Sequence, residues 1–131
     1  MSNVRRQMLP NRLRTSTWPE VEHFYERLVN ESLWPFEPML GFVRFVGSSP
    51  YAKSLFPATS HEVLLVSRVP DFARGDNELQ IAFNGASQVF SFTYTQRPDE
   101  TEPWSRSCGA PDGRVVFERL LHKRLRWFHE G

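Results

Sequence analysis

The chain has 131 residues and a mass of 15.3 kDa, a length that suits one domain with one hydrophobic core. Its 40% hydrophobic, 24% charged and 14% aromatic residues are typical of a globular protein and exclude a chain that is disordered throughout. The single cysteine excludes an intrachain disulfide framework, and no apolar run approaches the ~18 residues that span a bilayer.

The net charge of +1 conceals an uneven distribution of charge along the chain. Residues 1–17 contain four arginines and no acid, residues 18–113 contain seven basic and thirteen acidic residues, and residues 114–131 contain five basic and two acidic residues. We therefore predict a flexible basic tail over residues 1–16 and one domain over residues 17–131. An acidic body between basic ends can steer a charged partner.

The first residues also bear on the compartment. Arg5-Arg6 resembles the start of a twin-arginine export signal, but the polar and basic run Pro10–Arg14 follows where an apolar segment is needed. We therefore expect a cytoplasmic protein with no contact to a membrane.

The first predicted element is a helix from about Trp18 to Ser32. Thr17 and Glu20 form a capping box, and Pro19 suits the first turn. The apolar residues that recur at helical spacing are Val21, Phe24, Tyr25, Leu28 and Val29.

Two strands are then predicted, over Leu40–Val46 and over Glu62–Val69. The first contains Phe42, Val43, Phe45 and Val46 around Arg44, and the second contains a short β-branched run that ends before Pro70. Residues 47–60, with two prolines, are predicted to form a loop, and residues 71–77 a polar turn.

The clearest local pattern is a hairpin around Asn84-Gly85, with strands over Glu78–Phe83 and Ala86–Thr95. A two-residue type I′ turn there pairs Phe83 with Ala86, Ile81 with Gln88, and Leu79 with Phe90. One face of the pair then holds the apolar side chains Leu79, Ile81, Phe83, Phe90, Phe92 and Tyr94.

A second amphipathic helix is predicted from Asp112 to Trp127. The resulting order is α-β-β-β-β-α, and a sheet with one apolar face needs both helices to cover it. We therefore expect a two-layer α+β sandwich, in which a four-stranded, mainly antiparallel sheet carries the N- and C-terminal helices on one face.

Residues 97–113 show no periodicity and are predicted to form a long loop, a feature that is often functional. The loop contains Asp99, Glu100, Glu102 and Trp104, and carboxylates beside an aromatic residue suit a protein interface. Glu22 and Glu26, on the first helix, are a second candidate acidic patch. The alternative for Trp104 is that it packs onto the core.

No catalytic or metal-binding motif stands out, and we expect no catalytic residue, metal or cofactor. Cys108 could act as a nucleophile beside His122 or His129, but no sequence typical of thiol enzymes surrounds it. The four histidines form no zinc pattern. A small enzyme that uses Cys108 or a carboxylate pair stays a third hypothesis.

A basic stripe on the last predicted helix supports an alternative function. Arg119, Lys123 and Arg126 lie on one side of that helix and could contact phosphates together with the basic tail. This arrangement predicts a nucleic-acid-binding or regulatory module, whose affinity would fall steeply with salt.

The layout resembles the small immunity proteins of bacterial contact-dependent-inhibition and polymorphic-toxin systems. Three features carry the resemblance: the capped helix opening at Thr17-Trp18-Pro19-Glu20, the hairpin around Asn84-Gly85, and the closing segment Leu125-Arg126-Trp127-Phe128. The resemblance implies a protein that neutralises a toxin by occluding its active site, without chemistry of its own. The expected partner is a toxin with a basic cleft, and the sequence leaves the oligomeric state open.

Overall fold

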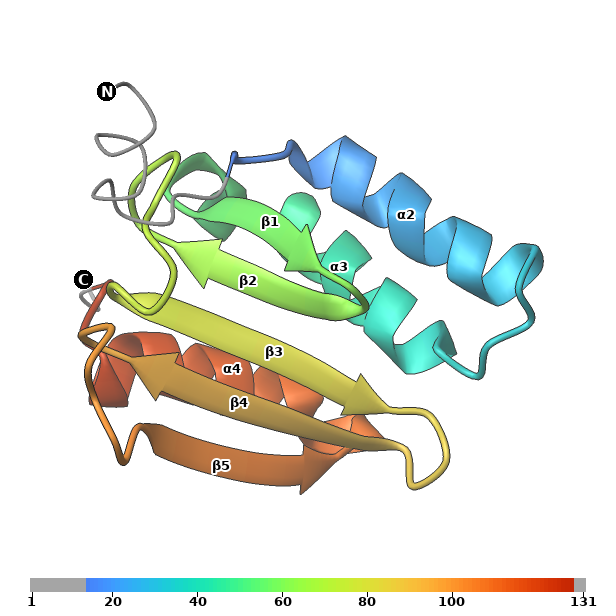
Figure 1. The fold of residues 1–131 in the computed structure, drawn as a ribbon. Helices are drawn as coiled ribbons and strands as arrows, with labels where there is room; N and C mark the ends of the chain where they lie inside the picture. Colours follow the sequence, from blue (N-terminus) through green and yellow to red (C-terminus); the bar gives the residue numbers. More distant parts are fainter. Residues whose placement is uncertain (1–13, 129–131) are drawn as a thin grey trace, which may run out of the picture.

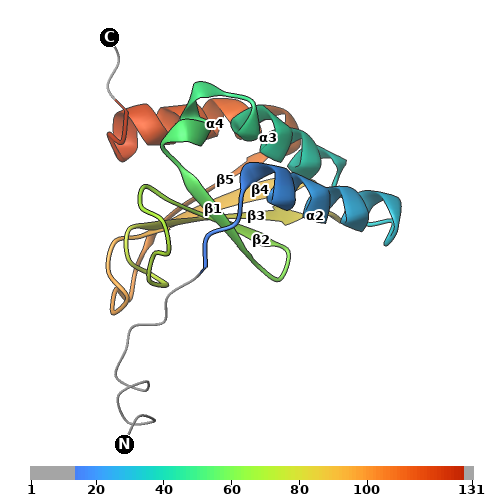
Figure 2. The ribbon, with the colours of Figure 1, turned by 90° about the horizontal axis from the view of Figure 1, so that it is seen from above.

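The computed structural model describes residues 14–128, which form an α+β fold with helices on one face of an antiparallel sheet (Figures 1 and 2). In chain order the elements are α2 (Trp18–Asn30), α3 (Glu37–Gly47), the 3-10 turn η1 (Pro50–Lys53), β1 (Phe56–Ser60), β2 (Val63–Ser67), β3 (Glu78–Asn84), β4 (Val89–Thr95), β5 (Trp104–Gly109), the 3-10 turn η2 (Ala110–Asp112), α4 (Gly113–Arg119) and the π-helical turn η3 (Leu120–Arg124). Each strand pairs with the next, in the order β1-β2-β3-β4-β5. Within this described part, no helix combines the length and apolarity needed to cross a membrane.

The helix α2 confirms the first predicted element and its capping box. The Thr17 hydroxyl accepts a hydrogen bond from the Glu20 amide, and the Glu20 carboxylate accepts one from the Thr17 amide. Each bond satisfies an amide that has no partner within the helix. The helix buries Trp18, Val21 and Tyr25 against the sheet.

The predicted strand over Leu40–Val46 is wrong, because these residues belong to the helix α3. Pro38 lies in the first turn of the helix, where its missing amide hydrogen has no cost, and Glu37 suits the positive end of the helix dipole. The buried residues Met39, Leu40, Phe42, Val43 and Val46 follow the helical period. We predicted a strand because aromatic and β-branched residues favour strands, and the run was too short to show the helical period clearly.

Two predicted loops also contain strands, so the sheet has five strands where four were expected. Residues 47–60 include η1 and then β1, which pairs with β2 along its whole length. Residues 97–113 include β5, which pairs with β4 from Tyr94↔Trp104 to Val89↔Gly109. Both are edge strands with several polar residues, and such strands lack the apolar alternation on which the prediction relied.

The β3–β4 hairpin is confirmed, but its turn and its register differ from the prediction. Phe83 pairs with Phe90, Ile81 with Phe92, and Leu79 with Tyr94, and residues 85–88 connect the strands. The Asn84 side chain accepts hydrogen bonds from the amides of the next turn, at Ala86 and Ser87. The register is displaced by four residues, an even number, and therefore the predicted apolar face survives.

The predicted C-terminal helix is shorter than expected. It begins near Asp112 as predicted, but α4 passes into η3, which ends at Arg124. Arg126 has a positive φ of 56°, so the helical stripe does not extend to it. Trp127 is buried against the core, and His129 lies outside the described residues.

The second face of the sheet is partly covered by the segment between β2 and β3. Ala58, Leu65 and Phe72 form a small apolar cluster there. Glu78 is fully buried beneath the same segment, where Arg74 pairs with its carboxylate at 3.0 Å and the Gly75 amide donates to it. Figure 2 shows this segment and the helices on opposite sides of the sheet.

The predicted basic tail falls mostly on residues 1–13, which lie outside the described residues. Its last residues are ordered against the fold. Thr15 and Asp71 exchange two hydrogen bonds, and the Ser16 amide donates to the Pro57 carbonyl at 2.8 Å.

Candidate functional site

The acidic loop before β5 holds the three carboxylates predicted to contact a partner. Asp99 is 88% exposed and lies 3.8 Å from the Arg97 guanidinium, and Glu102 is also exposed. Glu100 is partly buried and accepts a hydrogen bond from the Gln96 amide. The structure brings these acids together in one turn, but one of them already caps the local backbone.

Trp104 belongs to the strand that follows these acids. It is the first residue of β5, opposite Tyr94, and its half-buried ring packs against the main core on the side of the helices. The Arg124 guanidinium lies 5.6 Å from the centre of this ring. Trp104 therefore packs onto the core, as in the alternative considered from the sequence. Its ring lies between β5 and η3.

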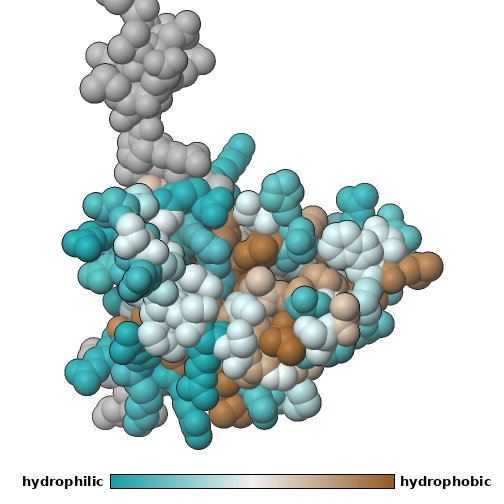
Figure 3. Space-filling model, turned by 60° about the horizontal axis from the view of Figure 1, so that its bottom comes forward, coloured by the Kyte–Doolittle hydropathy of each residue, from teal (hydrophilic) through white to brown (hydrophobic). Residues whose placement is uncertain are grey.

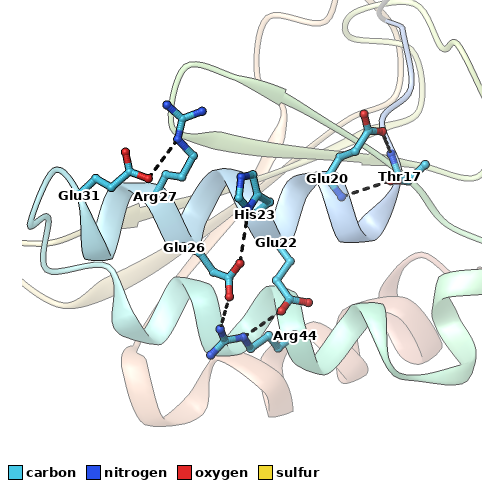
Figure 4. A network of polar contacts seen from close by, with 8 residues as sticks. All are labelled: Thr17, Glu20, Glu22, His23, Glu26, Arg27, Glu31 and Arg44. Carbon is cyan, nitrogen blue, oxygen red and sulfur yellow. Dashed lines mark hydrogen bonds and ion pairs between the residues drawn. The ribbon is translucent and has the colours of Figure 1, made fainter.

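Glu22 and Glu26, the second predicted patch, converge on one arginine of the neighbouring helix (Figure 4). The Arg44 guanidinium on α3 donates to Glu22 at 3.1 Å and to Glu26 at 2.7 Å. These contacts raise the pKa of Arg44, first through the hydrogen bond to Glu22. One positive charge thus offsets part of the negative charge on this face of α2.

The connection between α2 and α3, together with the first residue of α3, forms an exposed tip over residues 31–37 that the sequence did not single out. Leu33 is 80% exposed and has a positive φ of 57°, and Trp34 is 39% exposed. The left-handed region is unfavourable for a leucine, and exposure to water adds nothing to its stability. We call these seven residues the α2–α3 tip; they include the exposed acids Glu31 and Glu37.

The tip is held in place from beneath. The Trp34 amide donates to the Leu28 carbonyl at 2.9 Å, and the Trp34 ring packs edge-on against buried Phe36. The Gln88 side chain of the β3–β4 turn donates to the Pro35 carbonyl. A cavity of about 220 Å³ lies beside the tip and is lined by Phe24, Arg27, Leu28, Glu31 and Ser32. The exposed apolar residues are therefore presented by a fixed backbone.

A second feature is a positively charged hollow between β5 and the C-terminal helix. Its volume is about 210 Å³, and its lining consists of Trp104, Arg106, Val116, Arg119, Leu120, Lys123 and Arg124. We call it the basic groove. Arg119 and Lys123 were predicted from the helical stripe, whereas Arg126 is not among the lining residues. Arg106 was missed because β5 was expected to be a loop, and Arg124 because it lies beside the predicted stripe.

A hydrogen-bonded trio lies beside this groove. The Tyr51 hydroxyl is 3.0 Å from the Glu118 carboxylate and 2.9 Å from His122 Nε2. His122 Nδ1 is buried without a hydrogen-bond partner. Cys108 is not among these contacts.

Two further features bear on the hypothesis of a small enzyme: the reactivity of Cys108 and the presence of a metal site. Burial raises the pKa of the Cys108 thiol, and Asp112 adds to the effect, so the thiol is less reactive than a free cysteine at neutral pH. Among residues 14–128 no group of three His, Cys, Asp or Glu side chains is placed to hold a metal ion.

Comparisons with known proteins do not add an identity. No family model, no curated protein and no solved structure matches the chain.

Proposed function

We propose that this chain is a cytoplasmic binding protein that neutralises a basic bacterial toxin by covering its active site, with the α2–α3 tip at the centre of the contact. The observation that carries the proposal is Leu33, a leucine held in a left-handed conformation with its side chain in water, next to exposed Trp34. Backbone strain persists where the surrounding structure enforces it, and such places are often functional. Aromatic and aliphatic anchors are typical centres of protein interfaces.

The charge around the tip indicates the kind of partner. Five carboxylates lie along α2 and the tip, against the positive charges of Arg27 and Arg44; they are Glu20, Glu22, Glu26, Glu31 and Glu37. An apolar centre with an acidic surround complements a basic cleft of the kind that nucleases present. Attraction between the two would speed association, and the buried anchors would slow dissociation.

The acidic loop with Asp99, Glu100 and Glu102 stays a second candidate contact. It lies at the other end of the sheet from the α2–α3 tip (Figure 1). We expect it to contribute by long-range attraction, because Asp99 and Glu102 are exposed to solvent.

The decisive experiment uses the toxin domain of a large secreted or Rhs-like open reading frame next to this gene. Its C-terminal domain is expressed in a bacterial host with and without this chain, and growth and binding affinity are measured. We expect the chain to restore growth, and Leu33→Asp with Trp34→Ala to weaken binding at least 100-fold. Asp99→Lys with Glu100→Lys and Glu102→Lys should mainly slow association.

Two further variants separate binding from folding. Val69, 55% exposed on the segment after β2, gives a matched control as Val69→Asp, which should bind normally. Leu33→Gly fits the left-handed backbone and removes the anchor, so binding should weaken while the free energy of unfolding does not fall. Normal binding by Leu33→Gly would overturn the role of the tip, and failure of the chain to protect against the neighbouring toxin would overturn the function.

A further inference from the structure

We propose that the basic groove binds a single strand of nucleic acid through its phosphates, at a site separate from the α2–α3 tip. The inference goes beyond the proposed neutralising function and rests on different residues. It starts from how two elements meet. In β5, Arg106 pairs with Phe92 of β4, whose ring is buried beneath the helices. Arg106 therefore projects to the helical side of the sheet at its outer edge.

The helix supplies the other cations of the groove. Arg119 and Lys123 are four residues apart and lie on one face of the helix, and Arg124 follows in the same turn. The contact of Arg124 with the Trp104 ring holds its guanidinium at the groove. The side chains that must contact a ligand are thus partly ordered before it binds, which lowers the entropy lost on binding.

The charge of the groove is unbalanced. Among the residues that the structure describes, its lining contains four cationic side chains and no carboxylate. Arg106, Arg119 and Arg124 form no ion pair with any residue in the described range 14–128. Like charges around one hollow repel one another, and an anion placed among them relieves this repulsion. Arginine also matches phosphate oxygens with paired donors.

The shape favours a strand over an isolated phosphate. A second hollow of about 300 Å³ lies on the other side of Arg119 and Lys123 and is lined also by Val115, Glu118 and His122. The two hollows share their central cations, so successive phosphates can lie along one path across the helix. Glu118, the one acid among the described residues that line the two hollows, accepts a hydrogen bond from the Tyr51 hydroxyl.

The surroundings agree with this assignment. In the space-filling view hydrophilic side chains gather at the end of the molecule where η3 and the loop before β5 lie, and apolar side chains lie toward the other end (Figure 3). The helix α3 separates the α4 edge from the acid-rich helix α2 (Figure 2). The carboxylates of α2 therefore do not face the path of the strand, whereas the acidic loop before β5 leads into Trp104 at one end of the groove.

The test measures binding of a fluorescein-labelled twelve-residue oligothymidylate by anisotropy at several salt concentrations. The groove variant combines Arg106→Gln, Arg119→Gln and Arg124→Gln. The control combines Arg27→Gln, Lys53→Gln and Arg68→Gln, which removes the same charge from exposed positions elsewhere. We expect the groove variant to lose at least tenfold in affinity at low salt, and its slope of log K against log salt to fall by about 2. The control should change affinity less than threefold.

Three results would overturn the inference. Equal losses in the two variants would show attraction to the overall charge and no particular site. Absence of binding by the unchanged chain at low salt would exclude the strand. Inorganic phosphate or ATP that binds the groove while the oligonucleotide does not would show a site for free phosphates only. Circular dichroism of both variants confirms that they are folded.

Discussion

At the scale of one residue, Tyr25 links a buried side chain to the pH dependence of folding. Its ring is fully buried between α2 and the sheet, and its hydroxyl donates to the Glu62 carbonyl at 2.9 Å. Burial raises the pKa of Tyr25 well above its usual value, and the nearby Glu62 carboxylate raises it further. The folded state therefore keeps this proton at a pH where the unfolded chain releases it.

The sign of the effect follows from this difference in proton binding. Stability from Tyr25 is complete below pH ~10, the pKa of an unfolded tyrosine, and declines as the pH rises above it. Between pH 8 and pH 11 the free energy of unfolding should fall by about 1.4 kcal/mol more in the unchanged chain than in Tyr25→Phe. Urea unfolding of both proteins at these pH values measures it, and equal slopes would show that the hydroxyl ionises in the folded state.

The burial of Glu78 could not be predicted from the sequence. The alternation of β3 places it correctly on the polar face of the hairpin, but not in the fully buried position that the structure gives it. Its burial depends on Arg74 and Gly75, which fold back from the preceding segment to pair with the carboxylate. The spacing of apolar and polar residues along a strand does not indicate which loop residues will contact that strand. Capping of α2 was predictable because the contact between Thr17 and Glu20 is local.

At the scale of elements, the same contrast separates the confirmed predictions from the wrong ones. α2, β2 and the β3–β4 pair carry their own apolar pattern and were found. β5 contains Ser105, Arg106 and Ser107 and forms a strand because β4 offers it an edge. The hairpin turn likewise depends on a distant segment, since Pro35 lies so close that a Cβ on Gly85 would come within 2.8 Å of its Cγ. Thus the acids of the loop before β5 were predicted from the sequence. The basic groove was not predicted, because two of its lining residues, Trp104 and Arg106, belong to β5.

Two glycines allow a matched test of how helices pack in this fold. Gly41 lies in the middle of α3, beside a cavity of about 360 Å³, and a Cβ added there would meet no atom within 4 Å outside the backbone of its own helix. Gly113 begins α4, and a Cβ there would lie 2.7 Å from the ring of buried Phe90.

We expect the same substitution to have opposite effects at these two positions. Gly41→Ala should raise the free energy of unfolding by about 0.5–1 kcal/mol, because alanine loses less backbone entropy in a helix. Gly113→Ala should lower it by about 1–3 kcal/mol through overpacking. Urea unfolding followed by circular dichroism measures both. A Gly113→Ala protein as stable as the unchanged chain would show that the Phe90 ring can move aside.

At the scale of the whole molecule, the helical layer separates two kinds of charge. The acid-rich helix α2 lies over one edge of the sheet and α4 lies over the other, with α3 between them (Figure 2). The helix α2 contains three glutamates and one arginine, whereas α4 and η3 together contain four lysine or arginine residues and one glutamate. Such a molecule can attract a basic partner at one edge and an anionic partner at the other.

The separation predicts that the two proposed surfaces act independently. The α2–α3 tip and the basic groove share no residue, and distant sites usually contribute additively. The groove variant should protect cells from the neighbouring toxin as well as the unchanged chain does, and Leu33→Gly should bind the oligonucleotide with an affinity within about twofold of that of the unchanged chain. Addition of one toxin domain per chain, an amount that leaves no toxin cleft uncovered, to the labelled oligonucleotide complex should raise the anisotropy further. Displacement of the oligonucleotide by the toxin would contradict independence and would place both ligands on one surface.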